Sequence, residues 1–235
     1  MIDLRQRSNA KELMDGDDIS FEAMAQTLRE LNIINSRLGG HAITISGVEQ
    51  LITQGEPVRI CEIGCGGGDN LFAIYKYCMR NKIPAVFIGI DLNPECIAFA
   101  QQQYPQIPCE WICSDYAAVS FGNKQPDIIF SSLFCHHFTN DQLVPMLKWL
   151  QENSRKGFFI NDLQRHWLAY YLIKWITQFF SRSYLVKHDA CISVARSFIK
   201  QDWKFLFQRA GINNYNIGWR WAFRFLVIFK KYPPG

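Results

Sequence analysis

The sequence predicts an α/β fold around a mostly parallel central sheet. Apolar, strand-like runs alternate with segments of helical periodicity through the middle of the chain, which is typical of βαβ units. Near the C-terminus two further strand-like runs, 213–220 and 222–230, follow one another with almost no spacer, so they must be antiparallel. With 235 residues, the chain is long enough to bury the core of one such domain.

The elements can be placed in chain order from their periodicity and their boundary residues. An N-terminal helix is expected over 21–38, because apolar residues recur there at helical spacing and Gly39-Gly40 ends the pattern. The first strand, 58–63, is followed by a glycine-rich turn, and Gly211 ends a late helix over 200–209. The intervening strands are expected over 85–90, 109–113, 126–133 and 157–160, and the intervening helices over 69–80, 94–103 and 141–153.

A helical insertion is predicted over 163–198. Its segment 167–180 is densely aromatic and aliphatic but shorter than the ~20 residues that a membrane-spanning helix needs. We expect a lid over a pocket for a flat hydrophobic molecule. The alternatives are ordinary core packing and an interfacial helix whose Lys174, Arg182 and Lys187 meet anionic head groups. The domain prediction is a helical cap over 1–50 and a single α/β domain over 51–235.

Composition narrows the class of protein. The net charge of +4 comes without any block of five like charges, so no nucleic-acid arm is expected. The eight cysteines form no C-x-x-C pair, so we predict free thiols and no metal site. The N-terminus lacks the apolar core of a signal peptide, and we expect a cytoplasmic monomer or homodimer.

The glycine-rich turn reads Glu62-Ile63-Gly64-Cys65-Gly66-Gly67-Gly68. Glycines after a buried strand let the backbone turn sharply and approach a ligand, while the next helix offers free N–H groups. The dinucleotide fingerprint needs a third glycine where Asp69 stands. Glu62 adds a carboxylate suited to the ammonium group of an amino acid. Both features favour S-adenosylmethionine over a nicotinamide dinucleotide.

Acidic residues also follow the next two strands. Asp91 stands where open α/β sheets place the acid that accepts hydrogen bonds from ribose hydroxyls, and Asn93 before Pro94 is the better helix cap. Asp115 and Tyr116 follow the third strand and predict contact with adenine, with a plain turn as the alternative. The predicted cofactor site comprises Glu62, Gly64, Cys65, Gly66, Gly68, Asp91, Leu92, Asp115, Tyr116 and Ser132.

These motifs, E-x-G-x-G-x-G, Asp91 and Ser114-Asp115, resemble those of the class I S-adenosylmethionine-dependent methyltransferases over about 58–138. Within that family the chain most resembles the ubiquinone and menaquinone biosynthesis type and small bacterial enzymes that O-methylate phenolic and polyketide rings. The resemblance implies a Rossmann-like sheet of seven strands whose last strand is antiparallel. It implies no substrate contacts within the insertion.

Two histidines, His136 and His137, follow the fourth strand, where ligands bind beyond the carboxyl ends of such sheets. An imidazole with an unperturbed pKa of ~6.5 can deprotonate a phenol, so both are predicted catalytic residues, with a structural role as the alternative. The [DNS]-P-P-[YFW] motif is absent here, which disfavours transfer to nucleic acid. His166, Tyr170 and Arg196 are predicted to contact the substrate.

The predicted function is S-adenosylmethionine-dependent methylation of a small hydrophobic or aromatic acceptor, with O-methylation of a phenol, quinol or polyketide-like compound as the first choice. Three alternatives stay open from the sequence. They are C-methylation of a quinone precursor, an NAD(P)-linked oxidoreductase on a related sheet, and methylation of protein or RNA.

Overall fold

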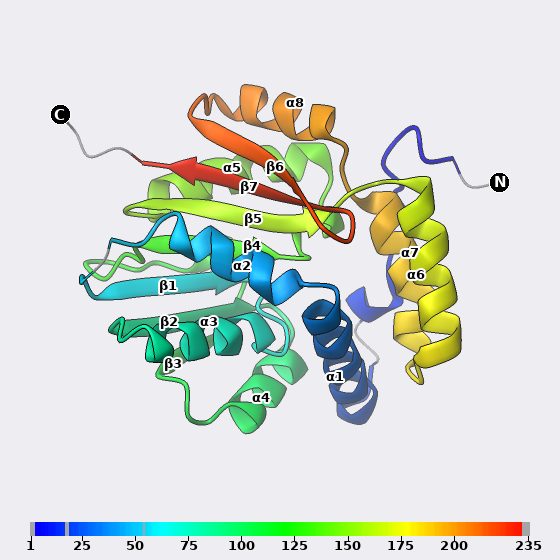
Figure 1. Ribbon diagram of the computed structural model, residues 1–235, viewed down its shortest axis with the longest axis horizontal. Coiled ribbons are helices and arrows are strands. Elements are labelled where there is room, and N and C mark those ends of the chain that lie inside the picture. Colours follow the sequence, from blue (N-terminus) through cyan, green and yellow to red (C-terminus); the bar gives the residue numbers. More distant parts are fainter. Residues whose placement is uncertain (1–2, 17–18, 54, 232–235) are drawn as a thin grey trace.

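The computed structural model describes residues 3–16, 19–53 and 55–231, and these form a seven-stranded sheet with helices on both faces (Figure 1). The strand order is β3-β2-β1-β4-β5-β7-β6. The strands are β1 (Val58–Ile63), β2 (Ala85–Asp91), β3 (Cys109–Cys113), β4 (Ile128–Ser132), β5 (Gly157–Leu163), β6 (Tyr215–Arg220) and β7 (Arg224–Lys230). β1 to β5 pair in parallel, and β7 runs antiparallel to both of its neighbours, β5 and β6, so the predicted fold class is confirmed.

Two helical layers bury the sheet. On one face α2, α3 and α4 cover apolar side chains that include Ile60 and Phe87, and on the other α5 and α8 cover side chains that include Ile129 and Phe158. The helices are α1 (Phe21–Arg37), α2 (Gly40–Glu49), α3 (Asp69–Arg80), α4 (Pro94–Gln103), α5 (Asn140–Asn153), α6 (Trp167–Phe180), α7 (Tyr184–Arg196) and α8 (Lys200–Ala210). Short 3₁₀ turns are η1 (Leu13–Asp15), η2 (Tyr116–Ala118) and η3 (Cys135–His137).

Helix α2 was not predicted, because its sequence contains glycine and β-branched residues and lies just beyond the Gly39-Gly40 stop. Gly39 takes a left-handed φ of 76°, which ends α1 and lets α2 begin at once. Within α2, a Cβ atom at Gly47 would lie 2.6 Å from the ring of Phe159. The glycine therefore lets α2 pack directly on β5.

Strand β5 runs three residues beyond its predicted end at 160. Its ladder with β7 continues through Asn161, Asp162 and Leu163, which pairs with Arg224. This extension places two polar side chains, Asn161 and Asp162, in the buried sheet at its functional edge.

The predicted insertion consists of two helices, α6 and α7, which pack against each other. Together with α1 they stand at the edge of the sheet where the parallel strands end (Figure 1). None of the described helices is long and apolar enough to cross a membrane.

Candidate functional site

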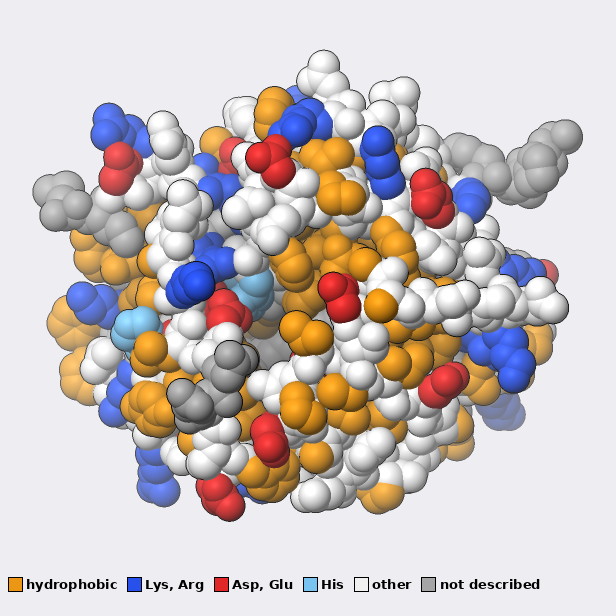
Figure 2. All heavy atoms as spheres, turned by 180° about the vertical axis from the view of Figure 1, so that it is seen from behind, with side chains coloured by type: hydrophobic (Ala, Val, Ile, Leu, Met, Phe, Trp, Pro, Cys, Tyr) orange, Lys and Arg blue, Asp and Glu red, His pale blue; other side chains and the backbone are white. Residues whose placement is uncertain are grey.

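A cavity of about 1320 Å³ lies at the carboxyl ends of the parallel strands. Its walls come from the ends of β1, β2 and β4, from η1 and η3, and from α1, α6, α7 and the β6–β7 turn. Pockets for one small molecule usually measure about 300–1,000 Å³, so this cavity has room for two molecules side by side. From behind, the molecule shows a hollow bordered by hydrophobic side chains, with histidine and acidic side chains beside it (Figure 2).

The glycine-rich turn forms one end of the cavity. Gly64 and Gly66 both have left-handed φ angles, 63° and 49°, which other residues adopt only with strain. A Cβ atom at Gly64 would lie 2.1 Å from the ring of Phe134. The turn thus brings bare backbone to the cavity wall underneath an aromatic ring.

Glu62 lies at the head of this turn and is 1% exposed. Its Oε1 accepts a hydrogen bond of 3.2 Å from Asn70, whereas its Oε2 has no partner among the described residues. Burial, and then the negative charges of Asp69 and Asp91, raise the pKa of Glu62 well above its usual value, against the opposing hydrogen bond from Asn70. A cation placed at Oε2 would satisfy this carboxylate.

Asp91 ties the end of β2 to the glycine turn. Its Oδ2 accepts from the backbone N–H of Gly66 at 2.7 Å, and its Oδ1 accepts from the N–H of Asn93 at 2.9 Å. Asn93, with Pro94 after it, caps α4, as the sequence predicts. Each carboxylate oxygen of Asp91 keeps a lone pair that can accept from a ligand hydroxyl in the cavity.

Asp115 and Tyr116 line the next part of the cavity wall. Oδ1 of Asp115 accepts a hydrogen bond of 2.9 Å from the backbone N–H of Ala117, so the turn that was the alternative to adenine contact is present. The other carboxylate oxygen, Oδ2, is available to a ligand. The ring of Tyr116 meets Phe134 and Trp149 edge-on. Burial, and then the charge of Asp115, raise the pKa of Tyr116 to about 12, which keeps the phenol neutral.

Nearly all of the predicted cofactor residues line the cavity. These are Glu62, Gly64, Cys65, Gly66, Asp91, Leu92, Asp115, Tyr116 and Ser132. Gly68 is the exception, since it starts α3 with a left-handed φ of 77° and packs where a Cβ would lie 2.6 Å from Trp111. The buried hydroxyl of Ser132 has no partner among the described residues, so it too is available to a ligand.

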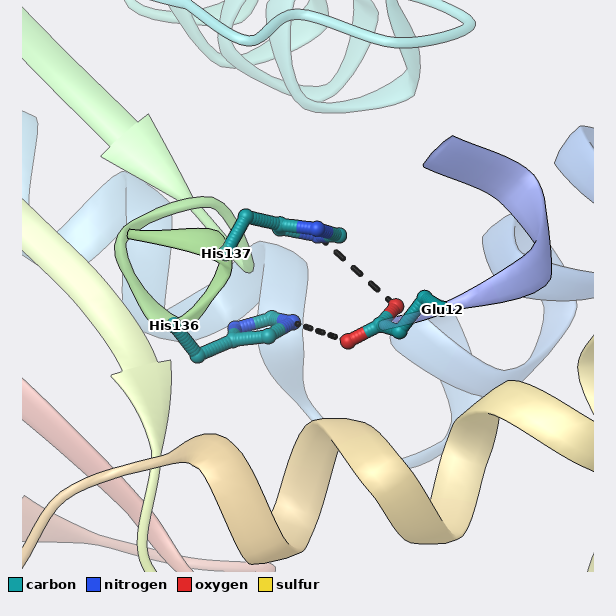
Figure 3. A group of neighbouring side chains, drawn as sticks. All are labelled: Glu12, His136 and His137. Atoms are coloured by element: carbon teal, nitrogen blue, oxygen red, sulfur yellow. Dashed lines mark ion pairs between the residues drawn. The ribbon is translucent and has the colours of Figure 1, made fainter. Parts of the chain in front are cut away.

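The histidine turn forms another wall of the cavity, beside the glycine turn. It begins with Leu133, whose φ of 54° is left-handed, a strained conformation for a non-glycine residue. Nδ1 of His136 lies 2.7 Å from Asp162, and Nδ1 of His137 lies 3.0 Å from Asp15. Both rings point toward Glu12, which comes from the N-terminal segment (Figure 3).

Charges around the histidine turn shift the pKa values of His137 and Asp162. Burial alone would lower the pKa of His137, but Asp15 and Glu12 raise it above its ordinary value. Burial alone would raise the pKa of Asp162, but His136 beside it brings the pKa below its usual range. The Asp162 carboxylate accepts a hydrogen bond from Nδ1–H of His136, which leaves the lone pair of that ring on Nε2.

The three predicted substrate contacts do not line the cavity. His166 caps α6 and stacks on Phe223, and Tyr170 meets Tyr171 edge-on. Arg196 donates hydrogen bonds to the carbonyl oxygens of His136 and His137, so it supports the histidine turn from behind.

Four residues that sequence analysis assigned no role join the site: Glu12, Asp15, Asp162 and Arg224. Asp162 follows the rule that identified Asp91, because it stands at the carboxyl end of a parallel strand. Arg224 begins β7, is 2% exposed, lines the cavity and has an Nε atom without a partner among the described residues. Glu12 and Asp15 lie in a segment without periodicity or motif, so nothing in the sequence marks them.

Comparison with known proteins agrees with this geometry. Residues 60–157 match the family model described as a methyltransferase domain. The fold is similar to that of the plantazolicin methyltransferase BpumL in complex with SAH, with a TM-score of 0.64 and 20% identity over 90% of this chain and 95% of that one. It is also similar to the magnesium protoporphyrin IX methyltransferase ChlM from Synechocystis PCC 6803 with bound SAH, with a TM-score of 0.55 and 17% identity over 83% of this chain and 84% of that one.

A curated relative matches more locally. The biotin biosynthesis bifunctional protein BioHC of Cellvibrio japonicus (strain Ueda107) is 33% identical over 86 residues, which cover 37% of this chain. The match spans only 16% of BioHC. The family match favours a methyltransferase over the oxidoreductase alternative.

We expect the buried carboxylate of Glu62 to make the fold less stable at alkaline pH. Because its folded-state pKa is raised above the unfolded value, the folded protein holds that proton more tightly. This contribution to stability is complete below the unfolded-state pKa and is lost as the pH rises through the folded-state pKa. Urea unfolding from about pH 5 to 9 should show wild type losing stability relative to Glu62→Gln.

The matched control for this experiment is Glu49→Gln, an exposed position on α2. It should keep the pH dependence of the wild-type protein. Parallel stability curves for wild type and Glu62→Gln would contradict the assignment of an uncompensated buried carboxylate.

Proposed function

We propose a specific reaction for this chain, which belongs to the class I S-adenosylmethionine-dependent methyltransferases: methyl transfer to the hydroxyl of a small hydrophobic or aromatic acceptor. A phenol, quinol or polyketide-like compound fits this description. One observation carries the proposal. The polar Glu62–Gly66 turn and the His136–His137 turn line one and the same cavity, together with many apolar side chains.

The polar end suits the amino-acid part of S-adenosylmethionine. Glu62 offers an unpaired carboxylate oxygen for the ammonium, and Arg224 offers a buried guanidinium for the carboxylate. Burial lowers the pKa of Arg224 to about 10, so it is still a cation at neutral pH. A chain of hydrogen bonds through Asn70, Thr44 and Asn161 links the two groups and fixes their positions.

The adenosyl part would lie along the ends of β2 and β3. Asp91 would accept from the ribose hydroxyls, and Asp115 and Tyr116 would contact the adenine. When bound, S-adenosylmethionine supplies a methyl group on a sulfonium centre, open to attack by a nucleophile. The protein's main contribution is to hold the acceptor oxygen in line with that methyl group.

The acceptor end combines an apolar wall with proton-accepting groups. Helix α6 supplies Ala169, Leu172, Ile173 and Ile176 to the wall. An imidazole nitrogen of His137 is placed to take the proton of an acceptor hydroxyl while Asp15, 3.0 Å from Nδ1, stabilises the resulting cation. His136 is oriented by Asp162 in the same manner, so either ring can serve, and we assign the first role to His137.

The cofactor assignment predicts that pure protein binds S-adenosylhomocysteine. In isothermal titration, Asp91→Ala and Arg224→Met should each weaken binding about 10- to 100-fold, or ~1.4–2.8 kcal/mol, because each loses a charged hydrogen-bonding group. Glu110→Gln, an exposed substitution on neighbouring β3, is the control and should bind like wild type. No heat with wild type, or the same heat with Asp91→Ala, would contradict the site.

The acceptor assignment predicts which compounds are methylated. Incubation with S-adenosylmethionine and a panel of phenols, quinols, amines, protein and RNA should release S-adenosylhomocysteine with the hydroxylated ring compounds. Proton NMR of the product should show an O-methyl signal. An aryl C-methyl signal would instead support C-methylation of a quinone precursor, and turnover only with protein or RNA would overturn the small-molecule assignment.

The outer face of α6 suggests where a hydrophobic acceptor is collected. Trp175, Phe179 and Phe180 are 63%, 71% and 83% exposed, unlike most aromatic side chains of this size. Residues 163–188 contain no acidic side chain, and Lys174, Arg182 and Lys187 accompany the aromatic ones. This edge gathers hydrophobic and basic side chains (the left edge of Figure 2). We propose weak contact with an anionic membrane surface, because charge and aromatic content are complementary to it.

Membrane contact is testable with vesicles. Wild type should co-sediment with vesicles that contain about one-third phosphatidylglycerol, and the double variant Trp175→Ser, Phe179→Ser should lose at least ~10-fold in partitioning through its lost apolar area. Met79→Ser, which changes a 63% exposed side chain on α3, is the control. Equal sedimentation of all three proteins would contradict the proposal. It would also be contradicted if wild type and Met79→Ser were dimers and the double variant a monomer, because the exposed aromatic side chains would then form a dimer interface.

Two further expectations remain proposals. A cytoplasmic location is supported by the eight cysteines, all of which are free thiols. A helical cap over 1–50, within a single structural domain that includes 51–235, is supported by α1, which borders the cavity, and by α2, which packs on the sheet itself.

A further inference from the structure

We infer that Glu12, His136 and His137 form a binding site for a divalent transition-metal ion at the acceptor end of the cavity. One donor atom from each residue lies within 4.8 Å of the other two. Two imidazoles and one carboxylate make a common protein ligand set for Zn²⁺ and for other ions that accept nitrogen and oxygen ligands. No sequence motif marks the set, because Glu12 lies far from the histidines along the chain.

The spacing of the three side chains is too wide for hydrogen bonds. Nε2 of His136 lies 3.6 Å from Oε1 of Glu12, and Nε2 of His137 lies 3.8 Å from Oε2 (Figure 3). Hydrogen bonds between such atoms measure about 2.7–3.2 Å. Ligands about 2.0–2.2 Å from a tetrahedral metal ion lie roughly 3.3–3.6 Å apart, which is much closer to the observed spacing.

One carboxylate oxygen of Glu12 is buried without a hydrogen-bond partner among the described residues. This oxygen is Oε1, and Glu12 is 4% exposed. A buried carboxylate left in this state is costly, and the cost falls when a cation binds it. The unpaired oxygen faces His136 and thus points into the cluster.

Both histidines are already oriented as metal ligands are. The Nδ1 atoms face carboxylates, at 2.7 Å from Asp162 for His136 and at 3.0 Å from Asp15 for His137. An ionised carboxylate only accepts, so the hydrogen bond between Nδ1 of His136 and Asp162 leaves the lone pair of that ring on Nε2. Nδ1 of His137 lies close to Asp15 but forms no hydrogen bond among the described residues. This carboxylate–histidine arrangement fixes ligating imidazoles in metalloproteins.

The surrounding charges also favour a cation. Glu12, Asp15 and Asp162 bring three carboxylates to the cluster. The nearby guanidinium groups are committed elsewhere, since Arg196 donates to the carbonyl oxygen of His136 at 3.0 Å and Arg7 donates to that of Phe138 at 2.8 Å. Among the described residues, neither arginine forms an ion pair with any of these three carboxylates.

The remaining coordination position would face the cavity, because all three ligands line it. An open position of this kind is typical of catalytic rather than structural metal sites. A hydroxyl bound there would have its pKa lowered, and its proton would pass to solvent. This role rests on the proposed function, and it would replace His137 as the group that activates the acceptor, since Nε2 would then be a ligand.

Metal binding can be measured without any activity assay. Protein stripped with EDTA should bind Co²⁺ at one ion per chain with a Kd of about 1 µM or below, with visible absorption bands that Zn²⁺ abolishes. Glu12→Gln keeps the size of the side chain but removes the charge, and it should weaken binding at least ~10-fold. Asp15→Asn should weaken it by about 10- to 100-fold through the orientation of His137.

His166→Asn, which replaces a histidine outside the cluster and keeps a side chain able to cap α6, is the matched control and should bind Co²⁺ like wild type. Circular dichroism and S-adenosylhomocysteine affinity should be unchanged in Glu12→Gln, which shows that the variant is folded. Absence of stoichiometric Co²⁺ binding, or equal binding by wild type and Glu12→Gln, would overturn the metal site. If the metal site fails in this way but the protein still binds S-adenosylhomocysteine, the methyltransferase proposal stands. If the protein binds Co²⁺ but not S-adenosylhomocysteine, the metal site stands and the methyltransferase proposal fails.

Discussion

The reversal of strand order between β1 and β4 is the constraint on which the site depends. The chain builds β1, β2 and β3 outward in one direction and then returns to the other side of β1 to place β4 and β5. The connections after β1 and β4 therefore leave toward opposite faces of the sheet, and a crevice opens between them. The glycine turn after β1 and the histidine turn after β4 form its two sides, packed together where Phe134 lies against Gly64.

Closing this crevice requires segments that lie far from it in sequence. The backbone N–H groups of Leu13 and Met14 donate to Asp189 on α7, at 2.8 and 2.9 Å, and this holds η1 beside the histidines. Glu30 on α1 accepts from the backbone of Ser183 at the start of α7, which fixes the insertion against the cap. The cap and the insertion thus hold each other in place over the cavity.

The parts of the site that sequence can predict are those encoded by short-range rules. The glycine turn, Asp91 and its neighbour Asn93 occupy positions set by one strand and the helix after it, so their spacing alone identifies them. Glu12 depends on where a segment without regular periodicity folds back, and no local pattern specifies that. His166, Tyr170 and Arg196 were assigned from proximity to an aromatic run, but proximity does not give the direction in which a helical side chain points, as Arg196 shows by packing behind the histidine turn.

The fold and the cavity also differ in how their buried side chains contribute to stability. Hydrophobic packing on both faces of the sheet stabilises the fold. The cavity wall, by contrast, collects buried polar atoms without a partner among the described residues: one oxygen each of Glu12, Asn35 and Glu62, the hydroxyl of Ser132, Nδ1 of His137 and Nε of Arg224. Such groups are unfavourable in a folded chain unless a ligand completes them. Glu62 and Arg224, of opposite charge, are linked through Asn70, Thr44 and Asn161, whereas Glu12 lies beside the two histidines. A zwitterion at the first pair and a cation at Glu12 would satisfy each in turn, so ligand binding and folding stability should rise together.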